Sequence, residues 1–520
     1  MKELPTYNDA KTLLSPIQKI GQFFMPAAFI NDTEDEIRAL EDLIRDHGIG
    51  GICFFHSRAS AATNFEGKKK VLRNEESFET LKSLIKRYQS VSKYPLFIAI
   101  DAEWGLAMRI ENTPQYPYAI TLGAFTGKKQ LVYEVGKSIA HDCLAAGIHW
   151  NLSPVVDINN NPDNPVIGYR SFGDNREQVT QKALAYIKGT ESPGILTSIK
   201  HFPGHGDTSV DSHPGIPVID KSKKELTENE LYPFQNIISE GVDAVMVGHL
   251  SIPALAKGKQ EPASISKDII TDFLRGEMNF KGVVISDALN MHAVSKNYPV
   301  PGELEWLAYN AGNDILCFAE HVKEGIGIIA KNASENQLEE TFERVWKLKE
   351  KAMGNPYQNK FKELSKSAAL NWQIARESIT LYHGTEADIT EFSSETFCTL
   401  TLKRTLENAA HEEILTFLEE AKQEIKEEKN ILLLLTPPKV KPANQFGFYQ
   451  EEIDFINTIL EEKNVVIYHF GNPYSLKLFD IKNSLATVLV YQDFTEFQDV
   501  ATEHFLGKIK ANGKLPVSLT

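Results

Sequence analysis

The segment KHFPGHGDTSVDSHPGIP, residues 200–217, concentrates side chains that can transfer protons or bind a ligand. It holds three histidines and two aspartates among three glycines and three prolines. Glycine and proline at this density exclude a helix or a regular central strand. We therefore interpret the segment as a loop that binds a metal, braces the fold or moves protons.

An Asp–His pair within this loop favours proton transfer. Asp211 and His213 are two residues apart, so their side chains lie on the same side of an extended segment. A carboxylate at that distance orients the imidazole and stabilises its protonated form. Such a histidine can protonate a leaving group and later accept a proton from water.

A metal site is the alternative use of the same loop. Proline and glycine at 203 and 204 prevent the first two histidines from sharing a helical face, and the loop has no thiolate pair. Its nitrogen and oxygen ligands would be His201, His205, Asp207, Asp211 and His213.

The loop follows one of a series of short apolar runs, which we expect to be buried parallel strands. About eight β–α units in roughly 350 residues fit a (β/α)8 TIM-like barrel, with a doubly wound open sheet as the alternative. Several runs end in a polar residue, and barrel active sites lie at the carboxyl ends of the strands, which favours the barrel. The expected strands are 21–29, 49–55, 95–101, 148–157, 195–202, 243–250, 282–287 and 313–318. The polar residues at strand ends are Asp101, Asp157, His201, His249 and Asp287.

Asp287 ends the apolar run in GVVISDALNM, residues 282–291. An ionised carboxylate beside a buried strand is costly unless it is paired or used. Asp287 is therefore either one half of a structural salt bridge or a covalent nucleophile.

The chain divides into two expected domains. A long charged helix is followed by the turn-rich stretch MGNPYQNKFKE, where we place the boundary. We expect a catalytic barrel over 1–352, a linker over 353–365 and an α/β sandwich over 366–520. The strands of the sandwich are expected within 377–384, 430–438, 464–473 and 485–493.

Composition limits the class of protein. Hydrophobic content of 42% and 24% charged residues are ordinary for a globular protein, and the net charge of −15 argues against nucleic acid or an anionic membrane as partner. The four cysteines form no C-x-x-C pair, so we expect reduced thiols. The opening MKELPTYNDAKTLL has no apolar core typical of a signal peptide. We expect a cytoplasmic protein, or an exported one if a signal preceded this sequence.

Several of these segments together resemble the glycoside hydrolase family 3 β-N-acetylglucosaminidases of the two-domain type. KHFPGHGDTSVDSH is similar to that family's histidine loop, and IDAEWGLAMR to its D-x-E-x-G-x-x-x-R segment. RSFG at 170–173 resembles its arginine motif and SDALNM its nucleophile motif. ESITLYHG and GKLPVSL resemble the ends of the smaller domain, so the resemblance spans nearly the whole chain.

The resemblance implies a retaining exo-β-N-acetylglucosaminidase that acts on peptidoglycan-derived muropeptides and needs no cofactor or metal. Asp287 would be the nucleophile, and His213, oriented by Asp211, the acid/base. His205 and Asp207 we interpret as braces of the loop. The positions that match the family's sugar-binding residues are Asp101, Arg109, Arg170, Lys200 and His201. The partner is a carbohydrate, with no nucleic acid and no membrane, and the sequence does not predict an oligomeric state.

Three other functions stay open at this point. The nearest is a β-N-acetylglucosaminide phosphorylase, because a deprotonated histidine is neutral and repels phosphate less than a carboxylate does. The others are another β-glycosidase of the same family and a metal-dependent amidohydrolase. A catalytically silent glycan-binding protein is disfavoured, because a binder needs neither a nucleophile nor a proton shuttle.

Overall fold

The computed structural model describes residues 3–57, 74–125, 127–208, 216–358, 360–404 and 411–519. It contains two compact units that are discontinuous in sequence. The first comprises Met1–Tyr116, Val132–Ile158 and Val179–Lys366, and the second comprises Pro117–Leu131, Asn159–Gln178 and Ser367–Thr520. The domain limits 1–352, 353–365 and 366–520 stay a prediction.

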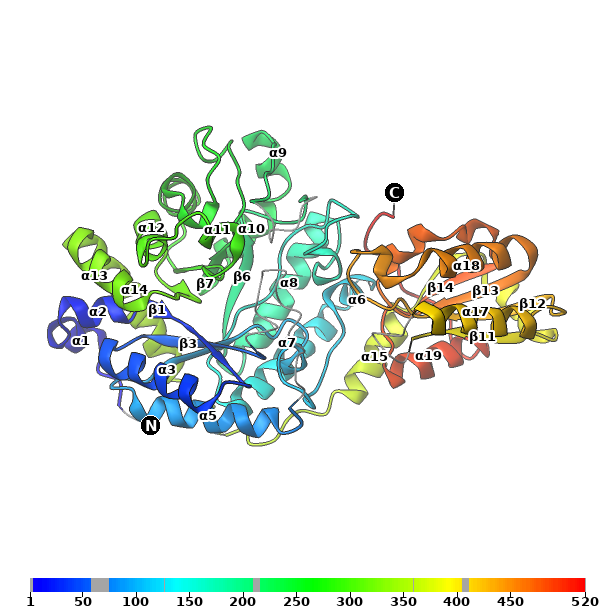
Figure 1. Ribbon diagram of the computed structural model, residues 1–520, viewed down its shortest axis with the longest axis horizontal. Coiled ribbons are helices and arrows are strands. Elements are labelled where there is room, and N and C mark those ends of the chain that lie inside the picture. Colours follow the sequence, from blue (N-terminus) through cyan, green and yellow to red (C-terminus); the bar gives the residue numbers. More distant parts are fainter. Residues whose placement is uncertain are drawn as a thin grey trace. The chain divides into compact units, whose positions relative to one another are not determined.

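A parallel sheet that closes on itself forms the centre of the first unit (Figure 1). Seven strands pair in the order β2-β3-β4-β5-β6-β7-β8, and β9 pairs with β1, which directly precedes β2. A parallel bridge between Ile285 and Ile315 connects β8 to the segment entering β9 and so completes the ring. The predicted TIM-like barrel is confirmed. Its strands are β1 (Phe24–Met25), β2 (Ala27–Phe29), β3 (Gly51–Phe55), β4 (Phe97–Ile100), β5 (Trp150–Asn151), β6 (Leu196–Phe202), β7 (Ala244–Val247), β8 (Val283–Ser286) and β9 (Leu316–Cys317).

Helices lie on the outside of this sheet, so the strands are covered on both faces and can be continuously apolar (Figure 1). The sequence encodes their ends locally. In α3 (Glu34–His47), Thr33 and Glu36 form a capping box, and Gly48 ends the helix at φ 58°, a conformation that favours glycine. The other main helices are α5 (Ser77–Val91), α7 (Lys129–Ala146), α8 (Arg176–Glu191), α10 (Tyr232–Ser239), η4 (Asp268–Glu277), α12 (Glu303–Ala311), α13 (Val322–Asn332) and α14 (Glu335–Met353).

The second unit is built on a five-stranded sheet in the order β10-β14-β13-β12-β11. Its strands are β10 (Thr380–His383), β11 (Cys398–Leu402), β12 (Asn430–Leu435), β13 (Asn464–His469) and β14 (Ala486–Leu489), and only β10 runs antiparallel to its neighbour. Helices α15 (Ala368–Ser378) and α16 (Glu386–Ser394) pack with α19 (Thr495–Phe505), whereas α17 (His411–Glu424) packs with α18 (Gln450–Glu462). The predicted separate α/β domain is confirmed.

Two segments of the chain between barrel strands pack into the second unit. Gln492 donates a hydrogen bond to the Thr121 hydroxyl at 2.8 Å. The backbone N–H of Ser518 donates to Asp174 at 2.7 Å. Residues 117–131 and 159–178 therefore fold with the C-terminal part of the chain, although both belong to the expected barrel in sequence.

All four cysteines are free thiols. Within the described ranges, every helix is too short or too polar to cross a bilayer.

Candidate active site

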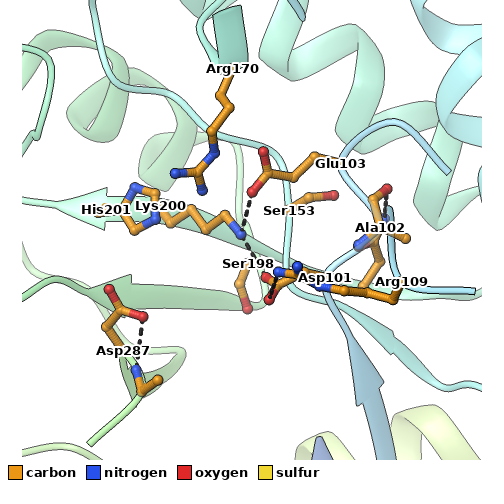
Figure 2. Close-up of polar contacts among 12 residues, drawn as sticks. Asp101, Ala102, Glu103, Arg109, Ser153, Arg170, Ser198, Lys200, His201 and Asp287 are labelled. Carbon is orange, nitrogen blue, oxygen red and sulfur yellow. Dashed lines mark hydrogen bonds and ion pairs between the residues drawn. The ribbon is translucent and has the colours of Figure 1, made fainter. Parts of the chain in front are cut away.

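The carboxyl ends of three barrel strands bring the predicted polar residues together. Asp101 directly follows β4, Lys200 and His201 lie near the end of β6, and Asp287 directly follows β8. Figure 2 shows their side chains grouped at this end of the strands, together with Arg109. Parallel strands of a barrel present their carboxyl ends at one face, which is why residues so distant in sequence meet here.

Asp101, Glu103, Arg109 and Lys200 form a network of alternating charge. Lys200 Nζ lies 2.7 Å from Asp101 Oδ1 and 2.8 Å from Glu103 Oε1. Arg109 Nη2 lies 3.1 Å from Asp101 Oδ2, and its guanidinium stacks 3.6 Å from the centre of the Phe55 ring. Two carboxylates thus hold two cations in fixed positions before any ligand arrives.

The network keeps Asp101 ionised. Burial opposes ionisation of this carboxyl, but Lys200 and Arg109 outweigh it and hold the pKa of Asp101 below its ordinary value. The Nε donor of Arg109 is buried and has no hydrogen-bond partner among the residues that the structure describes. A fixed carboxylate beside a buried, unsatisfied donor suits the recognition of a ligand's hydroxyl groups.

Asp287 is an ionised carboxylate that is not committed to a structural ion pair. Its Oδ1 accepts the backbone N–H of Ala288 at 2.8 Å, and it forms no salt bridge with any described residue. Burial alone would raise the pKa of Asp287. The nearby His249, His201 and Lys200 outweigh this effect, so the pKa of Asp287 lies below its ordinary value. The geometry therefore favours a reactive carboxylate over the structural salt bridge.

Asp157 anchors the start of the histidine loop. Its side chain is fully buried and accepts the backbone N–H groups of His201 at 3.1 Å and His205 at 2.8 Å. Its Oδ2 also accepts the Nδ1–H of His201 at 2.8 Å, which fixes the orientation of that ring. Burial opposes ionisation of Asp157, but His201 and His205 hold its pKa below the ordinary value. At Gly206 a side chain would lie 1.6 Å from the Ile158 carbonyl oxygen, so the loop can approach the strand end only with glycine there.

His205 and Asp207 brace the loop, as expected. His205 Nδ1 hydrogen-bonds the Thr208 hydroxyl at 2.8 Å. Asp207 pairs with Lys221 at 2.5 Å, and Lys221 also contacts Glu230 at 2.6 Å. Both side chains are thus engaged in contacts within the protein.

The predicted roles of three residues stay predictions. Asp211 and His213 lie outside the described residues, so their roles stay predictions. Arg170 belongs to the second unit, at the end of η2 (Gly168–Arg170), where its Nη1 donates to the Val166 carbonyl at 3.3 Å. No group of three potential metal ligands occurs within the described residues.

Sequence reasoning left three residues of the site without a role. Glu103 forms an ion pair with Lys200. Its position two residues after Asp101 in the D-x-E segment is the sequence feature that could have predicted a place in the site. Asp157 and His249 were noted only as strand ends. His249 accepts a hydrogen bond from Ser264 at 2.7 Å on Nδ1 and donates from Nε2 to the Ala288 carbonyl at 2.9 Å. It thus positions the backbone immediately after Asp287.

Comparisons with known proteins agree with this architecture. Residues 17–348 match the glycosyl hydrolase family 3 N-terminal domain. Beta-hexosaminidase A of Pseudoalteromonas piscicida is 33% identical over 341 residues, which cover 60% of this chain but only 55% of that protein. The chain therefore spans about half the length of this relative.

Solved structures extend the likeness to the second unit. A glycoside hydrolase family 3 beta-N-acetylglucosaminidase from Paenibacillus sp. str. FPU-7 is 25% identical and has a TM-score of 0.78 over 98% of this chain and 99% of that one. A beta-glucoside phosphorylase, with 21% identity, has a TM-score of 0.80 over 99% of this chain and 96% of that one, and this likeness concerns the fold alone. The match over 17–348, which covers more than half of the chain, shows that the chain belongs to glycosyl hydrolase family 3.

Proposed function

We propose that this protein is a retaining exo-β-N-acetylglucosaminidase. The observation that carries the proposal is Asp287, an ionised carboxylate without a salt bridge to any described residue, at the same end of the barrel as the Asp101–Lys200 network. The names of the Pseudoalteromonas and Paenibacillus relatives support the choice of an N-acetylated amino sugar.

The charged network would bind the terminal sugar. The Asp101 carboxylate can accept hydrogen bonds from sugar hydroxyls, while Lys200 and Arg109 can donate to them. Because these groups already hold one another, little side-chain entropy is lost when the sugar binds. A sugar that lacks one of the hydroxyls would leave a buried charge unpaired and would be rejected.

The reaction would proceed in two steps through a covalent intermediate. Asp287 attacks the anomeric carbon and forms a glycosyl-enzyme ester, while His213, oriented by Asp211, gives its proton to the departing oxygen. The neutral His213 then takes a proton from water, whose oxygen attacks the same carbon. Cleavage of the ester restores the Asp287 carboxylate and releases the sugar with retained configuration.

The natural substrate that we propose is N-acetylglucosamine at the non-reducing end of a peptidoglycan-derived muropeptide, and the proposed location is the cytoplasm. The choice of substrate follows from the family resemblance.

Release of aryl alcohol from matched substrates tests this proposal. The aryl β-N-acetylglucosaminide and the aryl β-glucoside are compared in phosphate-free buffer that contains a chelator. We expect kcat/KM to favour the acetamido sugar strongly, with N-acetylglucosamine as the product. Turnover only after phosphate is added, with a sugar 1-phosphate as product, would instead identify a phosphorylase. Turnover only after zinc is added would identify a metalloenzyme.

A further inference from the structure

A cavity lies at the opposite end of the barrel from the candidate active site. It has a volume of about 770 Å³, within the size range of small-molecule sites. Pro95 precedes β4, and Gly147 and His149 precede β5, so the cavity lies where these strands begin. Its remaining walls come from α5, the end of α7, the end of α14 and the segment that follows it.

The walls of this cavity are mainly apolar and are held in place. Ile85 and Leu144 are buried wall residues from α5 and α7. Phe361 lines the cavity and stacks on the His141 ring with 4.3 Å between ring centroids. These contacts give the site a preformed apolar surface for a ligand's body.

Most neutral polar groups of the cavity are already committed, and the exception is Gln358 Oε1, which is buried without a hydrogen-bond partner among the described residues. Gln89 exchanges two hydrogen bonds with the backbone of Leu96, at 2.9 and 3.0 Å. His149 accepts the Ile98 N–H on Nδ1 at 3.0 Å, and its Nε2 contacts the Gln358 amide. The polar groups that remain for recognition of a ligand are the lysines and the single acceptor Gln358 Oε1.

The mouth of the cavity carries uncompensated positive charge. Lys82 and Lys86 are four residues apart and share one face of α5, and Lys362 approaches from the segment after α14. Lys82 pairs with Glu79, but Lys86 and Lys362 form no ion pair with any described residue. No acidic side chain is among the described residues that line the cavity. In a chain of net charge −15, a cationic mouth over apolar walls selects for an anion.

We propose that this cavity binds an amphipathic anion, a small molecule with an apolar body and one carboxylate, sulfonate or phosphate group. The apolar body would occupy the space between Ile85, Leu144 and Phe361, and the anionic group would lie between Lys86 and Lys362. The site does not depend on the proposed glycosidase activity, because it shares no residue with the active-site cluster.

Two fluorescent probes that differ in charge test the proposal on the full chain. 1-Anilinonaphthalene-8-sulfonate carries a sulfonate, and N-phenyl-1-naphthylamine is its uncharged counterpart. We expect the sulfonate probe to bind the wild-type protein, and its affinity to fall about three-fold for each of Lys86→Gln and Lys362→Gln. The uncharged probe should bind equally to the wild type and to both variants.

Two further variants complete the design. Ser90→Trp places a bulky ring at an exposed wall position and should weaken binding of both probes, whereas Lys224→Gln, far along the chain on an exposed helix, should change neither. The proposal is overturned if the wild type does not bind the sulfonate probe, or if its affinity is the same in all four variants. It is also overturned if Lys86→Gln and Lys362→Gln lower the melting temperature but leave the affinity for the sulfonate probe unchanged. The two lysines would then stabilise the fold without binding the anion.

Discussion

Lys200 connects the two halves of the candidate site at the scale of single residues. Its side chain is 2% exposed, binds Asp101 and Glu103 directly, and contributes to the lowered pKa of Asp287. This buried cation therefore positions the Asp101 and Glu103 carboxylates and also contributes, after His249 and His201, to lowering the pKa of Asp287. His249 positions the backbone that follows Asp287, because its Nε2 donates a hydrogen bond to the Ala288 carbonyl.

Replacing Lys200 tests this dual role. Lys200→Met removes the positive charge, so the pKa values of Asp101 and Asp287 should rise and the acidic limb of the kcat/KM profile should move to higher pH. At pH 7 we expect kcat/KM to fall about 10²-fold, because the sugar-binding carboxylates also lose their anchor. The matched control is Lys223→Met, an exposed partner of Glu277. An unshifted acidic limb would show that Lys200 does not act on the nucleophile.

His213 is tested by the leaving group. In His213→Ala the departing oxygen receives no proton, so natural disaccharides with poor leaving groups should lose far more activity than activated aryl glycosides. Steady-state kinetics on the two substrate types measures the difference. Equal losses on both would remove His213 from the role of acid.

At the scale of elements, Asp157 couples strand β6 to the loop that follows it. Asp157→Asn should lower the free energy of unfolding by roughly 2–4 kcal/mol, because a buried charge with three hydrogen bonds is lost. Asp207→Asn removes one partly exposed ion pair from the same loop and should cost less than about 1 kcal/mol.

The effect of Asp157→Asn should depend on pH. The pKa of Asp157 is lowered in the folded state, so its stabilisation is complete above the unfolded value of about 3.9 and is lost as the pH falls through the folded value. Urea denaturation at several pH values should show a constant difference from wild type near neutrality and a smaller one in acid. A difference that grows in acid would contradict the account.

The sequence predicted the positions of the barrel strands well, because a parallel strand covered on both faces is a continuous apolar run. The same logic found Asp101, His201 and Asp287, which lie at or near strand ends, whereas Lys200 was identified only through the family resemblance. Strand β11 was missed because CTLTL alternates between buried and exposed side chains at the edge of its sheet. The interactions of Glu103 and Asp157 were missed because they join different strands, which no local pattern records.

At the scale of the whole molecule, sequence order and packing diverge. The segments 117–131 and 159–178 leave the barrel strands and fold with residues 367–520. Linear patterns reveal a change from one set of elements to another, but they do not reveal which distant segments pack together. The expected boundary near residue 353 is a single cut in the sequence, whereas each compact unit is made of three separate segments.

Truncation tests the importance of this exchange. A chain ending at Lys366 would lose the partners of Thr121 and Asp174 and expose surfaces that are buried in the second unit. We expect it to aggregate, or to unfold at a lower urea concentration than the full chain. A soluble fragment with an unchanged unfolding midpoint would show that the barrel is independent of residues 367–520.

The central claim is that Asp287 becomes glycosylated during turnover. The most direct measurement is mass spectrometry of the protein after incubation with 5-fluoro-N-acetylglucosaminyl fluoride, a substrate analogue that slows release of the intermediate. We predict one added fluorosugar on the peptide that contains Asp287, and neither adduct nor turnover in Asp287→Asn, with Asp272→Asn behaving as wild type. An adduct on another residue, or turnover above a few per cent in Asp287→Asn, would contradict the account.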